Sequence, residues 1–193
     1  MTALILGLLL FLGVHSVRIV ADGWRSRTLA RVGEGPWKGG YTLLSLAGLA
    51  LIIWGFGQAR GAPTVLWATP VWTRHLAALL MLLSLVLLAA AYVPGNQIKA
   101  KLHHPMVLSV KVWAAGHLLA NNTAADLLLF GGFLTWAVLN FRAARQRDRA
   151  TGAVYPAGRL GATLVAVAVG VAAWAVLAFW AHGWLFGVRP FGR

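Results

Sequence analysis

The chain contains no cysteine and only four acidic residues among its 193 positions. Without cysteine it can form no disulfide, supply no thiolate to a metal and offer no cysteine nucleophile. So few carboxylates argue against a paired-carboxylate catalyst and against a transporter that relays protons through acids within its helices. Any metal chemistry must therefore depend on histidine or on one of these acids.

Charge of either sign is also sparse. Charged residues make up 11% of the chain and hydrophobic residues 60%, whereas a soluble domain has about a quarter of its residues charged. The apolar residues come in blocks of roughly 17–25, the length that a helix needs to cross about 30 Å of hydrocarbon. We expect an all-α, polytopic transmembrane bundle of about six helices, which forms one membrane domain over residues 1–193 and contacts the lipid bilayer.

Glycine, proline and charged residues separate the apolar blocks. Pro94 ends one block because it cannot continue the helical hydrogen bonds, and Pro105 suits the first turn of the next helix. The first block has no basic residue before it, so we expect it to remain as a helix rather than act as a secretory signal. The expected connections are a turn at 33–40, a loop partly on the membrane surface at 57–72, a solvated segment at 142–159 and a tail at 187–193. The expected spans are residues 2–20, 41–56, 74–93, 104–120, 124–141 and 160–186.

The basic residues lie mainly between the apolar blocks. A formal net charge of +13 could suggest nucleic acid, but short basic segments beside spans instead meet lipid headgroups or orient the helices. Twelve of the 17 Lys and Arg residues lie near the connections after the first, third and fifth spans, four lie near the others, and Lys111 lies within the fourth span. Because basic connections favour the cytoplasm, we expect a bacterial inner-membrane protein with both termini in the periplasm and no nucleic-acid partner.

The six histidines are the residues best suited to bind a cofactor. Histidine is costly in hydrocarbon unless it is paired, and its imidazole is a good ligand for haem iron. At 100° per residue His104 and His117 point about 140° apart, while His103 and His117 share a face but lie about 21 Å apart. A two-histidine haem site therefore needs a ligand from another helix. The alternative is that these histidines bond to their own helices or lie at the interface. The histidines are His15, His75, His103, His104, His117 and His182.

Two helical faces carry further candidates. Trp113 lies one turn before His117 and Asn121 one turn after it, which suits a haem pocket and equally an ordinary helix contact. On the first span His15, Arg18 and Asp22 form a stripe. Arg18 could pair with Asp22, meet an anionic group such as a haem propionate, or extend to the membrane edge.

Five short motifs in order resemble those of NnrU proteins and together cover the membrane domain. They are GVHSVR at 13–18, WTRHL at 72–76, YVPGN at 92–96, HPM at 104–106 and HLLAN at 117–121. The resemblance implies a role associated with denitrification, in nitrite and nitric oxide metabolism. The family is also similar to zeta-carotene isomerase, a membrane enzyme that uses haem b.

Carried over from that isomerase, the haem ligands fall on His15 and His117, and Ala114 stands where the isomerase has a cysteine. The resemblance thus implies haem b, held by His15 and His117 with His75 as a reserve ligand, and Arg18 and Asn121 beside the cofactor. It also implies an isomerase-like or redox step with a hydrophobic substrate or a redox partner. A second hypothesis is a cofactor-free assembly or transport factor in which the histidines only pack. A third, membrane methyl transfer, rests on the pair His104-Pro105.

Overall fold

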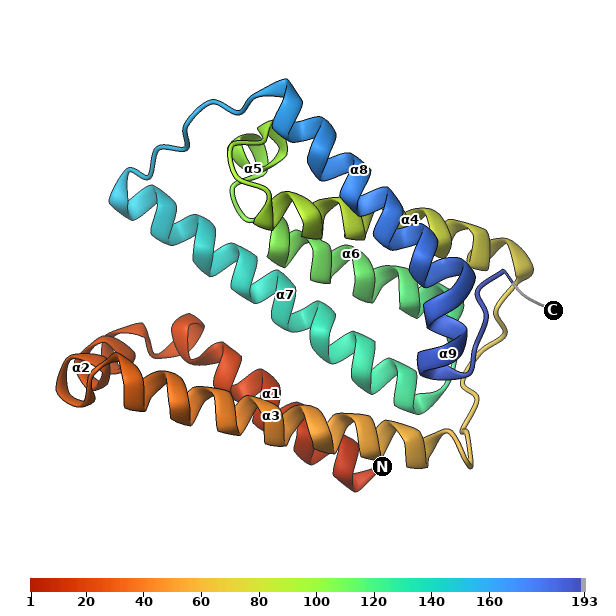
Figure 1. Ribbon diagram of the computed structural model, residues 1–193. Helices are drawn as coiled ribbons and strands as arrows, with labels where there is room; N and C mark the ends of the chain where they lie inside the picture. Colours follow the sequence, from red (N-terminus) through yellow and green to blue (C-terminus); the bar gives the residue numbers. More distant parts are fainter. Residues whose placement is uncertain (192–193) are drawn as a thin grey trace. The chain divides into compact units, whose positions relative to one another are not determined.

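The computed structural model describes residues 1–191, and the regular structure in this range is helical, without strands. The elements are α1 (Thr2–Val20), α2 (Asp22–Val32), α3 (Glu34–Ala59), α4 (Val71–Tyr92), α5 (Gln97–Leu102), α6 (Pro105–Ala120), α7 (Ala124–Thr151), α8 (Leu160–Val176), the π-helical segment η1 (Leu177–Ala181) and α9 (His182–Phe186). Figure 1 shows their order along the chain. The predicted all-α fold is confirmed. The predicted tail reaches residue 193, and its last two residues lie outside the described range.

Within residues 1–191, five helices are long and apolar enough to cross a membrane, as expected of a multi-pass membrane protein. They are α1, α3, α4, α7 and the continuous helix Leu160–Phe186, which contains α8, η1 and α9. The fourth predicted span, residues 104–120, corresponds to α6, which is apolar but has only 16 residues. About six spans is therefore close to what the structure shows.

Two predicted boundaries were wrong. The second span begins at Glu34 rather than at residue 41, because Gly33, with φ +81°, makes the whole turn and Pro36 fits within the first helical turn. The segment 142–159, predicted as a solvated connection, is helical as far as Thr151. Arginine is a good helix former, and no glycine or proline occurs there before Gly152. The connection at 21–33 also contains a short helix, α2, that buries no residue.

The chain packs as two compact units, of which the first comprises Met1–Ala68 and Asn122–Asn140. Its main contact joins α1 and α3, whose backbones approach closely at glycines. A Cβ atom on Gly55 would lie 2.2 Å from the backbone nitrogen of Leu4, and one on Gly7 would lie 2.6 Å from that of Ile52. Small residues are how membrane helices pack without a hydrophobic driving force between them.

The second unit comprises Thr69–Asn121 and the described residues from Phe141 onward. Here α4 packs against α6 and α8 (Figure 1). The buried hydroxyl of Ser84 on α4 donates to the backbone oxygen of Ser109 on α6 at 2.9 Å. Between α8 and α4, a Cβ on Gly170 would lie 2.5 Å from Val86 Cα. The single membrane domain over residues 1–193 stays a prediction.

Candidate functional site

His15 lies on α1 in the first unit, half-buried in an aromatic environment. Its Nδ1 lies 2.7 Å from the backbone oxygen of Phe11, so Nδ1 carries the proton and donates, and Nε2 keeps its lone pair. The ring stacks on Phe11 at 4.2 Å, and the rings of Tyr41 and Trp136 lie 5.1 and 6.1 Å away. An imidazole held by a backbone carbonyl in this way is oriented as metal-ligating histidines are.

An open groove of about 400 Å³ lies next to this histidine in the same unit. Its volume falls within the range of small-molecule sites, roughly 300–1,000 Å³. Trp136, whose ring contacts His15, is one of its lining residues, and the indole Nε1 of Trp136 is buried without a hydrogen-bond partner among residues 1–191. Such a buried donor normally has a hydrogen-bond partner. The groove is lined by Leu12, Ser16, Leu127, Leu128, Gly131, Gly132, Thr135, Trp136 and Leu139.

Arg18, one turn after His15, pairs with a carboxylate at the end of α1. Its Nε lies 3.8 Å from Asp22 Oδ1, and Arg25 lies 3.9 Å from the same oxygen. The side chains of Arg18 and Asp22 are 59% and 42% exposed, so water screens the pair strongly. Of the three alternatives considered for Arg18, the structure shows the pairing with Asp22.

His117 lies on α6 in the second unit and has a backbone contact like that of His15. Its Nδ1 lies 2.9 Å from the backbone oxygen of Trp113, and the two rings lie 5.1 Å apart. The side chain of Asn121, directly after α6, donates to the backbone oxygen of His117 at 2.8 Å. Trp113, His117 and Asn121 thus occupy successive turns of one helical face. Asn121 binds the helix end rather than the imidazole.

The reserve ligand His75 and a further candidate histidine, His182, lie elsewhere in the second unit. His75 is exposed near the start of α4. His182 begins α9, and its Nδ1 lies 2.7 Å from the backbone oxygen of Val188. The structure thus places His15 and Arg18 in the first unit, and His75, His117 and Asn121 in the second.

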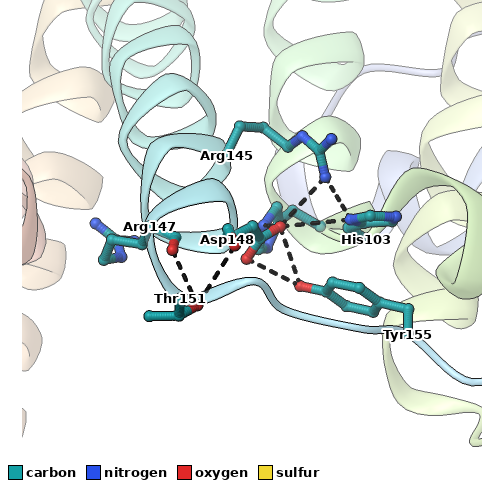
Figure 2. A network of polar contacts seen from close by, with 7 residues as sticks. His103, Arg145, Arg147, Asp148, Thr151 and Tyr155 are labelled. Atoms are coloured by element: carbon teal, nitrogen blue, oxygen red, sulfur yellow. Dashed lines mark hydrogen bonds and ion pairs between the residues drawn. The ribbon is translucent and has the colours of Figure 1, made fainter.

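A polar network that was not predicted from the sequence lies in the second unit, around Asp148 (Figure 2). His104 Nε2 donates to Asp148 Oδ2 at 2.8 Å, and Tyr155 Oη donates to Oδ1 at 3.2 Å. Arg145 NH1 lies 3.2 Å from Oδ2 and also contacts His103 Nδ1. Because arginine can only donate, His103 Nδ1 accepts, and both acceptors share the Arg145 guanidinium.

The network joins the turn before α6 to the end of α7 and the loop after it. His103 forms that turn with φ +66°, a conformation that non-glycine residues rarely adopt, and its ring stacks on Tyr155 at 3.9 Å. Burial, together with the charge of Asp148 and the hydrogen bond to it, raises the pKa of the Tyr155 phenol above its ordinary value of 10.0. The sequence signal was a histidine pair before Pro105 and a lone carboxylate within an arginine-rich segment.

The comparison with protein families finds NnrU protein, matched over residues 3–190. The chain belongs to the NnrU family. The match covers nearly the whole chain and confirms the resemblance carried by the five motifs. No curated protein and no solved structure matches this NnrU-family chain.

The donor set of this NnrU-family chain bears on the kind of cofactor it could hold. Within residues 1–191, no group of three or more His, Asp or Glu side chains could hold a metal ion. Haem iron, in contrast, needs from the protein only one or two axial ligands, of which histidine is a common one. The environments of His15 and His117 are compatible with that requirement.

Proposed function

We propose that this NnrU-family chain is a haem b-binding protein of the bacterial inner membrane, with His15 and His117 as axial ligands. The proposed role is in nitrite and nitric oxide metabolism during denitrification, or in a haem-dependent isomerase or redox step. Both termini lie in the periplasm in this proposal, as the distribution of Lys and Arg favours.

The environment of His15 is the observation that carries the proposal. The bond from Nδ1 to the Phe11 carbonyl leaves the Nε2 lone pair for a metal, and the ring lies among aromatic side chains. The apolar groove lined by Trp136 adds a place for a large apolar ligand, and the buried Trp136 Nε1 adds a donor without a partner. These features fit a porphyrin, whose faces are apolar and whose edge carries acceptors.

His117 is the proposed second ligand because its Nδ1 bonds to the carbonyl four residues earlier, as that of His15 does. In both histidines this bond assigns the lone pair to Nε2. His75 stays the reserve ligand, and Arg18 and Asn121 stay proposed neighbours of the cofactor.

When bound, haem would supply a redox-active or Lewis-acidic iron. The protein's part is to hold and orient the group. His15 would bind through Nε2, and the rings of Phe11 and Tyr41 would flank its imidazole. A hydrophobic substrate could reach the open groove directly from the bilayer.

Absorption spectra of detergent-purified protein test the proposal. Oxidised and reduced wild type is compared with His15→Ala, His117→Ala and the control His182→Ala, whose histidine bonds to Val188 instead. We expect a Soret band in the wild type and the control, and its loss or a marked shift in the other two variants. A colourless wild type, produced with ample haem, would contradict haem binding.

The cofactor-free assembly factor is the second candidate function, and one observation favours it. Bonds from Nδ1 to the carbonyl four residues earlier also form in helices that bind nothing, so His15 and His117 could serve packing alone. This candidate predicts that His15→Ala and His117→Ala complement a deletion strain as well as the wild type does.

A further inference from the structure

Lys111 is a cation at the mid-depth of the second unit. Ser109 on α6 hydrogen-bonds to Ser84 on α4, and further along α6 a Cβ on Gly116 would lie 2.7 Å from Met81 Cε. The helices therefore run antiparallel, and Lys111 lies level with α4 between Ser84 and Met81. That level is the middle of Val71–Tyr92, a candidate span with a mean hydropathy of 2.2.

Nothing in the described part of the chain neutralises this lysine. Its ammonium lies 5.5 Å from the centre of the Phe141 ring, and no carboxylate within residues 1–191 pairs with it. Asp148, the acid of this unit within the described range, already binds His104, Arg145 and Tyr155. An unpaired charge is expensive at membrane depth, so the cation needs an anion or access to the interface.

The ammonium of Lys111 is directed toward the arginine-rich end of α7. Phe141, the ring that it contacts, is the last apolar residue before Arg142, and the same ring lies 6.2 Å from that of His104, just before α6. A lysine stem of this length can extend along apolar surface to bring its head to the headgroup layer. Within residues 1–191, Trp136 Nε1 is the one side-chain nitrogen or oxygen that is fully buried without a hydrogen-bond partner. Lys111 Nζ is not such an atom, so part of its surface is exposed.

The segments near the start of α6 are rich in basic residues. The helix end after Phe141, the loop after it and α5 carry seven basic residues against the single acid Asp148. The backbone of Lys111 lies six residues, or about 9 Å along the helix axis, after the start of α6 at Pro105. The basic residues are Lys99, Lys101, Arg142, Arg145, Arg147, Arg149 and Arg159.

We propose that Lys111, whose ammonium lies over the Phe141 ring, binds the phosphate of an anionic phospholipid at this end of the second unit, where Arg142 is also exposed. The phosphate would neutralise an ammonium that no protein carboxylate pairs with, and the acyl chains would remain in the bilayer beside α6. Charge complementarity favours an anionic lipid over a zwitterionic one. The proposal does not depend on haem, because it concerns a different cation and predicts a different measurement.

Lipid-dependent thermal unfolding and native mass spectrometry test the proposal. Detergent-purified protein is titrated with phosphatidylglycerol, with phosphatidylcholine and with inorganic phosphate. We expect phosphatidylglycerol alone to stabilise the wild type, and its apparent affinity to be about fivefold weaker in Lys111→Met. Lys111→Arg should retain the wild-type affinity. Lys38→Met is the matched control, since Lys38 lies in the other unit and pairs with Glu34 at 2.5 Å.

Each remaining outcome overturns the proposal. Equal phosphatidylglycerol affinity in Lys111→Met and wild type would assign lipid binding to the surface arginines instead. Stabilisation by inorganic phosphate would point to a soluble anion. Equal stabilisation by phosphatidylcholine, which carries the phosphate without a net negative charge, would show that the charge of the lipid does not contribute. A Lys111→Met variant that fails to fold without lipid would show that the cation has a partner within the protein.

Discussion

The imidazole Nε2 of His104 lies 2.8 Å from Asp148 Oδ2, which links the residue before α6 to the last turns of α7. Forty-four residues separate the two in sequence. The Asp148 side chain is only 14% exposed, and it accepts from His104, Arg145 and Tyr155 together. This carboxylate therefore organises the polar end of the second unit.

Asp148→Asn should destabilise the protein, because the amide keeps the size of the side chain but removes the charge that binds Arg145. The measurement is the thermal midpoint in detergent. Asp22→Asn is the control, since Asp22 is 42% exposed and its arginine partners lie 3.8 and 3.9 Å away. We expect at least twice the loss in midpoint for Asp148→Asn, and equal losses would argue against an organising role.

Tyr155 should titrate later than an ordinary tyrosine. Burial and the neighbouring Asp148 charge raise its pKa in the folded protein, so folded protein holds this proton more tightly than unfolded protein does. The resulting stabilisation is complete below pH about 10 and is lost as pH rises through the higher folded pKa. Phenolate absorbance of wild type and Tyr155→Phe measures the titration. If the phenol that is present in the wild type and absent from Tyr155→Phe titrates at the ordinary pH of about 10, the expectation is wrong.

Gly55→Ala should loosen the packing of α1 against α3. The new Cβ would lie 2.2 Å from Leu4 N, a backbone atom that cannot move aside alone. We expect a loss of about 1–3 kcal/mol, as for overpacked cores. Gly40→Ala in the same helix meets nothing within 4 Å and should instead gain about 0.5–1 kcal/mol. Chemical denaturation in mixed micelles compares the two, and similar effects would count against close backbone contact.

The absence of cysteine makes the predicted orientation easy to test by labelling. Ser26→Cys on α2 and Ala62→Cys after α3 both introduce a thiol at an exposed position. Each variant then carries a single cysteine, because the natural chain has none. An impermeant maleimide added to intact spheroplasts should label Ala62→Cys alone, because basic residues hold the other connection in the cytoplasm. Labelling of Ser26→Cys under these conditions would show that the orientation is the opposite of the predicted one.

Span positions were predictable because hydrocarbon demands a long apolar helix, and apolar blocks are visible in composition alone. The bounds of α1 and the end of α9 at Phe186 agree with the prediction. The start of α3 did not, since glycine and proline indicate a turn locally but are tolerated in a first helical turn. The face shared by Trp113, His117 and Asn121 followed from helical periodicity.

By itself, then, the amino-acid sequence determined the helical membrane fold, the family motifs and the histidines worth examining. Only the tertiary structure decided which groups meet: the Asp148 network, the groove beside His15, and the level of α4 beside which Lys111 of α6 lies. The physical reason is that helix formation depends on residues within a few positions, whereas these contacts join side chains many tens of residues apart. Which residues face one another depends on how helices pack, and helix packing leaves no periodic signal in one sequence.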